Sequence, residues 1–173
     1  MRIIAFSLVF LAMSGSVNAS DVKNTVSLGY ANSHYSGVIS GNSPGFNIKY
    51  GIENTSNNLG LITSITSTSQ ELNVKNRRGK GRISHLSAML GPSWYINEKL
   101  SVYGLAGISH DRAKYSKVSG SDNSFSWGAG VRVTPLRNWS FDTSYEVLRN
   151  ADTEKNGTVL KAGTWVMGIG YSF

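Results

Sequence analysis

The stretch Gly163-Thr-Trp-Val-Met-Gly-Ile-Gly-Tyr-Ser-Phe173 decides the fold. Side chains of a strand alternate between two faces, and here one face is large and the other small. The large face carries Trp165, Met167, Ile169, Tyr171 and Phe173, and the small face carries Gly168, Gly170 and Ser172. Such a strand would be an aggregation hazard in water. The pattern is typical of a strand whose large face meets lipid and whose small face lines a narrow barrel.

Seven further segments read as strands, at roughly 24–35, 44–54, 59–70, 83–96, 100–110, 125–133 and 139–147. Residues 100–110 are apolar on both faces, so the register of that segment stays open. Short turns are expected at 55–58, 97–99 and 135–138, and long polar loops at 36–43, 73–82, 112–123 and 149–161. The sequence therefore predicts an all-β fold, an eight-stranded antiparallel transmembrane barrel with four long outer loops and three short periplasmic turns.

The charged residues decide which face is outward. In the clearly alternating strands the larger face lacks Lys, Arg, Asp and Glu, and the opposite face carries Lys49, Glu53, Arg132, Asp142 and Glu146. A slip of one residue would bring Lys49 and Arg132 to the lipid, at about 2–4 kcal/mol each near the bilayer midplane. We therefore expect these five charges inside, as a network of ion pairs with a structural role. A proton or solute path is the alternative, but the lumen of eight strands is filled by side chains.

A water-soluble barrel with the apolar face inward is a second possible fold. It would leave a solvated face made mostly of Gly, Ser and Ala, which suits a crowded lumen better than a surface. The membrane barrel is the favoured interpretation.

Residues 1–19 have the features of a secretory signal peptide. Arg2 is followed by an apolar run from Ile3 to Met13 and by the small-residue pattern Val17-Asn18-Ala19. The mature chain is then expected to begin near Ser20 and to form one barrel over residues 20–173. The chain has no Cys, so disulfides and thiolate metal sites are excluded, and neither a metal nor a cofactor is expected.

Six motifs with aromatic residues, five of which also contain Gly, occur in order along the chain. They are Gly45-Phe-Asn-Ile-Lys-Tyr50, Leu90-Gly-Pro-Ser-Trp-Tyr-Ile96, Val102-Tyr-Gly-Leu-Ala-Gly107, Phe125-Ser-Trp-Gly-Ala-Gly130, Phe141-Asp-Thr-Ser-Tyr-Glu146 and the final stretch from Gly163. Together they resemble the Ail/OmpX/Lom family of small outer-membrane proteins. The resemblance covers the mature chain, the strands better than the loops, and implies an eight-stranded barrel in the bacterial outer membrane.

The resemblance also implies roles. Tyr171 and the terminal Phe173 would form the signal that the barrel-assembly machinery reads during insertion. Family members include host-cell adhesins and invasins, factors that give resistance to complement, and envelope proteins without a settled role. Their binding residues lie in variable outer loops that cannot be matched residue by residue to this chain, so the family indicates the scaffold and leaves the ligand open.

Cations gather in the expected outer loops. The candidate ligand-binding residues are Lys75, Arg77, Arg78, Lys80, Arg82, Arg112, Lys114 and Lys117. Such a cationic rim could bind sulfated glycans, host matrix proteins or complement regulators. Alternatively it neutralises lipopolysaccharide of the cell's own outer membrane, in which case the protein is a structural envelope component. Nucleic acid fits the charge but not the compartment.

The three histidines are candidates for an enzymatic base at the outer rim. His34, His85 and His110 are all expected near the outer ends of strands, and Asp111 follows His110 directly. Serines are abundant, but no spacing singles out a nucleophile or a positioned carboxylate. We therefore expect no catalytic residues and no enzymatic activity.

Overall fold

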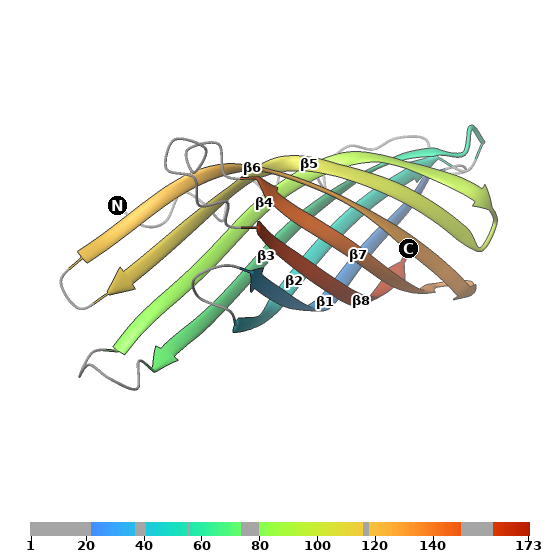
Figure 1. Cartoon of the computed structure of the whole chain (residues 1–173). Helices are drawn as coiled ribbons and strands as arrows, with labels where there is room; N and C mark the ends of the chain where they lie inside the picture. Colours follow the sequence, from blue (N-terminus) through green and yellow to red (C-terminus); the bar gives the residue numbers. More distant parts are fainter. Residues whose placement is uncertain (1–21, 37–40, 55, 74–79, 116–117, 150–160) are drawn as a thin grey trace, which may run out of the picture.

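The computed structural model describes residues 22–36, 41–54, 56–73, 80–115, 118–149 and 161–173. These residues form eight strands: β1 (Val22–Ser36), β2 (Gly41–Asn54), β3 (Leu59–Asn73), β4 (Lys80–Asn97), β5 (Leu100–Tyr115), β6 (Val118–Leu136), β7 (Trp139–Arg149) and β8 (Lys161–Ser172). Each strand pairs antiparallel with the next, and β8 pairs with β1 to close the barrel (Figure 1). The predicted fold class is confirmed, and residues 1–19 lie outside the described part.

The two faces of the barrel wall follow the alternation of the sequence. The larger side chains point outward, with Leu28 65%, Leu90 59% and Ile169 51% exposed. The intervening residues are buried in the lumen, most of them Ser, Thr or Gly. A closed barrel has no edge strand. Its apolar outer surface is stable only in contact with hydrocarbon. The predicted direction of the large face is therefore confirmed.

The register of β5, which the sequence left open, places one set of large side chains inside. Tyr103 and Leu105 point into the lumen and pack with Ile62 of β3 and Met89 of β4 in a small apolar cluster. Val102 and Ile108 point outward instead. The lumen of this barrel is thus filled partly by apolar residues beside its polar network.

Three short connections lie at one end of the barrel. Residues 55–58, 98–99 and 137–138 join β2 to β3, β4 to β5 and β6 to β7, as predicted. Asn58 has a φ of 58°, a left-handed conformation that Asn tolerates in tight turns. At the same end Asn24 and Phe173 exchange both backbone hydrogen bonds, at 3.1 and 2.9 Å, so the last residue is fixed to β1.

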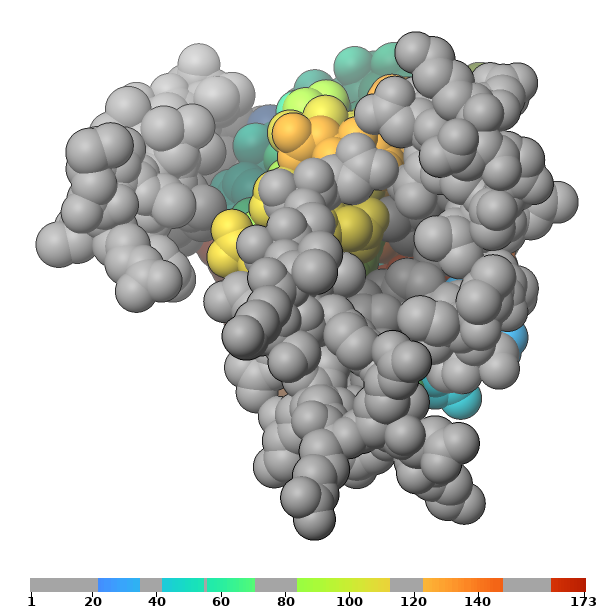
Figure 2. Space-filling model, turned by 60° about the vertical axis from the view of Figure 1, so that its left-hand side comes forward, coloured from blue at the N-terminus to red at the C-terminus, as the bar shows by residue number. Residues whose placement is uncertain are grey.

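The strands reach further at the opposite end than the sequence predicts. Most of segment 112–123 belongs to β5 and β6, which are separated only by residues 116–117, so the predicted loop there is wrong. Strand structure likewise covers Ser36 and 41–43 in the predicted loop 36–43. The hairpins β3–β4 and β5–β6 project beyond the other strands in Figure 1. In Figure 2, which brings this end forward, β5 and β6 reach the visible surface in yellow and orange.

All four tryptophans lie on the outer surface. Trp94, Trp127, Trp139 and Trp165 are between 47% and 62% exposed. Trp139 contacts Tyr171 edge to face at 5.5 Å, and Trp165 contacts Tyr145 in the same way at 5.8 Å. Outward aromatic rings of this kind form the girdles of membrane barrels at the lipid–water interfaces. In the part of the chain that the structure describes, no helix is long and apolar enough to cross a membrane.

Candidate functional site

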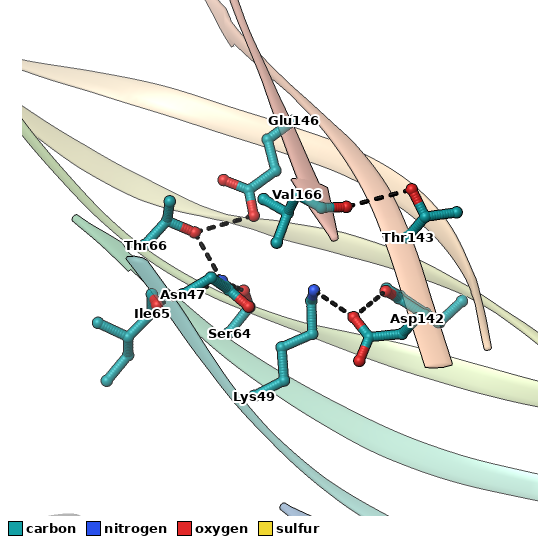
Figure 3. Close-up of polar contacts among 10 residues, drawn as sticks. Asn47, Lys49, Ser64, Ile65, Thr66, Asp142, Thr143, Glu146 and Val166 are labelled. Carbon is teal, nitrogen blue, oxygen red and sulfur yellow. Dashed lines mark hydrogen bonds and ion pairs between the residues drawn. The ribbon is translucent and has the colours of Figure 1, made fainter. Parts of the chain in front are cut away.

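The lumen holds an ion pair that joins two strands separated by β1 and β8. Nζ of Lys49 on β2 lies 2.6 Å from Oδ1 of Asp142 on β7, and both side chains are fully buried (Figure 3). The hydroxyl of Tyr103 on β5 donates a second hydrogen bond, at 3.4 Å, to the same carboxylate oxygen. A charge-assisted bond of this length in a desolvated lumen is strong, and it links β2, β5 and β7 across the barrel.

A second ion pair lies nearer the short turns. Nη1 of Arg132 on β6 donates to Oε2 of Glu53 on β2 at 3.3 Å, and the hydroxyl of Tyr95 on β4 donates to the same oxygen at 2.7 Å. Arg132 is 1% exposed, and a Cβ atom added to Gly51 would come within 2.9 Å of its Nη1. The absence of a side chain at Gly51 therefore provides the space that the guanidinium group occupies.

Glu146 differs from the other two acids because no cation among the described residues lies within ion-pair distance of it. Its carboxylate accepts hydrogen bonds from Oγ1 of Thr66 at 3.0 Å and from Oγ of Ser87 at 3.4 Å. Nδ2 of Asn47 bonds to Thr66 at 2.8 Å, which extends this network to β2 (Figure 3). All five lumen charges expected from the sequence are thus buried, and they occur as two ion pairs and one hydroxyl-bound carboxylate.

The histidines do not form a catalytic arrangement in the described part of the chain. Asp111 bonds to Nδ1 of the buried His85 at 2.8 Å and not to His110, because the register of β4 and β5 pairs it with His85. Nδ1 of His34 bonds to Asn42, and Nδ1 of His110 bonds to Asn123. Among the described residues, Nε2 of His85 has no hydrogen-bond partner. The described residues also contain no group of three metal-binding side chains.

Part of the predicted cationic rim falls on strands. Lys80 and Arg82 lie in β4 and Lys114 in β5, where the register pairs Arg82 with Lys114. Arg112 is exposed on β5, opposite Ser84. These positions lie at the end of the barrel away from the short turns. The remaining candidates, Lys75, Arg77, Arg78 and Lys117, lie outside the described residues.

Several lumen residues with a clear role were missed in the sequence. Tyr95 and Tyr103 donate to the two ion-paired carboxylates, and Thr66 and Ser87 donate to Glu146. Tyr95, Thr66 and Ser87 lie on the inward face that the alternation defines, so their direction could have been inferred. Tyr103 lies in segment 100–110, where the sequence leaves the register open. The partners of all four could not have been inferred, because they depend on the tilt and stagger of the strands around the closed barrel.

Comparison with known proteins gives a consistent result. The model of the outer membrane protein beta-barrel domain family matches residues 3–173. The attachment invasion locus protein of Yersinia enterocolitica is 37% identical, covering 99% of this chain and 98% of its own length. Outer membrane protein X of Enterobacter cloacae is 35% identical over 87% of this chain and 86% of its own length.

A solved structure agrees with these relatives. Ail, the attachment invasion locus protein of Yersinia pestis, in complex with the heparin analogue sucrose octasulfate, superposes with a TM-score of 0.77 at 33% identity, covering 89% of this chain and all of Ail. These relatives are named for attachment and invasion or for the outer membrane. With its closed barrel, lipid-facing outer surface and polar lumen, this chain belongs to the outer membrane protein β-barrel family and lies in the bacterial outer membrane.

Proposed function

We propose that this protein is a cell-surface adhesin that binds anionic groups of the host, with sulfated glycans as the first ligand class. The binding surface would be the end of the barrel away from the short turns, formed by β4, β5 and their flanking segments. The complex of Ail with a sulfated heparin analogue supports this ligand class, because that protein is 33% identical to this chain over most of its length.

The observation that carries the proposal is the register of β4 and β5. It sets Arg82 of β4 directly opposite Lys114 of β5. Arg112 lies two residues before Lys114 on β5. Like charges directly opposite one another destabilise a sheet, and a bound sulfate or carboxylate relieves that repulsion. On β3 the register places Glu71 opposite Arg82. Lys75, Arg77, Arg78, Lys80 and Lys117 belong to the same proposed surface.

Heparin chromatography of the detergent-folded protein tests this assignment. The variant carrying Arg82→Ser, Arg112→Ser and Lys114→Ser should elute at lower salt than the wild-type protein, because each lost cation removes one contact with sulfate. Arg137→Ser is the matched control, since Arg137 is an exposed cation in a short turn at the opposite end. Equal retention of the triple variant and the wild type would contradict the proposal.

A structural envelope role is the second candidate. It is favoured by Arg112, which is exposed on a strand flank, where lipopolysaccharide phosphates of the cell's own membrane can reach it. Transplanting the four outer connections onto an inert eight-stranded barrel separates the two roles. Gain of attachment to host cells or matrix proteins, or of survival in serum through complement regulators, supports the adhesin. Loss of membrane integrity alone on deletion of the protein supports the envelope role.

Export and insertion complete the proposed role. Residues 1–19 would direct secretion and be removed near Ser20, since their charge and apolar run match a signal peptide. Tyr171 and Phe173 would be read by the barrel-assembly machinery. Both rings are exposed on the outer surface, at 48% and 59%, where such a receptor can reach them. No catalytic activity is proposed, and changing His34, His85 and His110 to Ala should leave attachment unchanged.

A further inference from the structure

The outer surface of the barrel is hollowed by a groove lined by residues of β3 to β8. The groove has a volume of about 570 Å³ and is open to the surroundings. Its floor contains Gly104 of β5 and Ala129 of β6, and its walls include Trp94 of β4 and Tyr145 and Trp165 of β7 and β8. The lining side chains that point outward are almost all apolar. The groove is therefore a depression in the surface that contacts hydrocarbon.

The depth of the groove depends on a glycine that the packing of the chain does not require. A Cβ atom added to Gly104 would meet nothing within 4 Å. At eleven other glycines of the strands, from Gly29 to Gly170, a neighbouring atom lies at 3.1 Å or less. Glycine weakens a strand, because it loses more conformational freedom on folding and has no side chain to pack. A small residue at this exposed position therefore leaves space for a group from outside the chain.

The size of the groove matches one acyl chain. From Trp94 on β4 to Trp165 on β8 there are four inter-strand steps, or roughly 19 Å at about 4.8 Å each. One leaflet of the hydrocarbon core is about 15 Å thick. Because the strands are tilted, the groove also runs obliquely to the membrane plane, as an acyl chain entering from one leaflet would. The edge-to-face contact between Tyr145 and Trp165 holds the far wall in place.

We propose that the groove seats an acyl chain of a phospholipid from the periplasmic leaflet. The groove is continuous with the lipid-facing surface, and its near end, at Leu59 and Trp94, lies beside the short turns. Two of those turns carry the exposed cations Lys99 and Arg137, which complement a lipid phosphate, together with one acid, Glu98. The chain thus provides a seat for the acyl chain and a positive edge for the headgroup.

Photo-crosslinking in vesicles tests the proposal. The folded protein is reconstituted in phosphatidylethanolamine and phosphatidylglycerol, doped with a phosphatidylglycerol that carries a diazirine on one acyl chain, and the labelled peptides are mapped by mass spectrometry. Label should concentrate on β4 to β7 and be low on the opposite face, at Leu28 and Ile48. Gly104→Leu should reduce the label in the groove roughly tenfold, equivalent to about 1.4 kcal/mol of binding free energy.

Two further variants make the result decisive. Ala129→Leu fills the same floor from β6 and serves if Gly104→Leu does not fold, as judged by migration of the unheated protein on a gel. Ala88→Leu, at an exposed position of β4 outside the groove, should leave the labelling unchanged. Even labelling around the barrel, or no effect of either groove variant, would overturn the proposal. So would chain-to-chain crosslinks in the groove, or labelling only when the probe is confined to the outer leaflet.

Discussion

Lys49 and Asp142 form an ion pair of 2.6 Å in the lumen although 93 residues separate them along the chain. Neither residue lies on a strand adjacent to the other's strand, because β1 and β8 lie between β2 and β7. The pair therefore acts as a cross-link through the interior of the barrel, across the β1–β8 junction that closes the wall.

Removing one member of this pair should be more harmful than removing both. Lys49→Met leaves Asp142 buried without its cation, and we expect a loss of about 3–5 kcal/mol in the free energy of unfolding. The double variant Lys49→Met, Asp142→Asn should recover much of this loss. Urea unfolding in lipid vesicles, followed by tryptophan fluorescence, measures both values. If the separate effects of Lys49→Met and Asp142→Asn simply add up in the double variant, the two residues are not coupled.

Tyr95→Phe should destabilise the barrel at its short-turn end. The substitution removes the 2.7 Å hydrogen bond from the Tyr95 hydroxyl to Oε2 of Glu53, and hydrogen bonds to charged groups contribute about 1.5–3 kcal/mol. Tyr30→Phe is the control, because Tyr30 is exposed on the outer surface. The same unfolding measurement applies. A Tyr95→Phe protein as stable as the control would mean that Arg132 alone compensates Glu53.

The direction of the outer face can be tested with charge and with spin labels. Leu28→Arg should cost about 2–4 kcal/mol if Leu28 lies near the bilayer midplane, and Ser56→Arg, in an exposed short turn, should cost little. Spin labels at Ile48 and Val131 should be accessible to oxygen and shielded from a water-soluble nickel complex. Labels in an aqueous environment, or a folded product that stays soluble without detergent, would refute the membrane orientation.

The proposed role of Phe173 in insertion can be tested separately from its role in folding. Phe173→Ser should lower the amount of protein inserted in the outer membrane of cells, because the assembly machinery would lose part of its signal. Refolding into detergent, which needs no machinery, should be nearly unchanged. Phe125→Ser replaces an equally exposed phenylalanine on β6 and should not impair insertion. Equal insertion of the Phe173 and Phe125 variants would argue against a signal at the chain's last residue.

The sequence predicts the wall of the barrel better than its ends. Alternation of large and small residues predicts the outward side chains, such as Leu90, because lipid and lumen impose opposite demands on successive positions. Residues 112–123 show no such alternation, so the sequence predicts a loop there, although most of them belong to β5 and β6. In the middle of β5, Val102 and Tyr103 are both apolar, because the lumen there contains an apolar cluster.

The sequence predicts which charged residues lie in the lumen, but it does not predict which residues they contact. Burial of Lys49 and Glu146 follows from their position on the inward face. The choice of Asp142 as the partner of Lys49 depends on how far the strands are staggered around the barrel, which short-range patterns do not encode. The same holds for Asp111, which neighbours His110 in sequence but bonds to His85 across the sheet.

The reciprocal backbone bonds between Asn24 and Phe173 have a consequence for protein quality control. A polypeptide truncated before β8 would leave backbone donors and acceptors of β1 and β7 unpaired in the hydrocarbon. Each unpaired group would destabilise the protein by several kcal/mol. A barrel that lacks a strand is therefore unstable in the bilayer. Incomplete translation products would thus remain in the periplasm, exposed to proteases, and the membrane would accept finished molecules only.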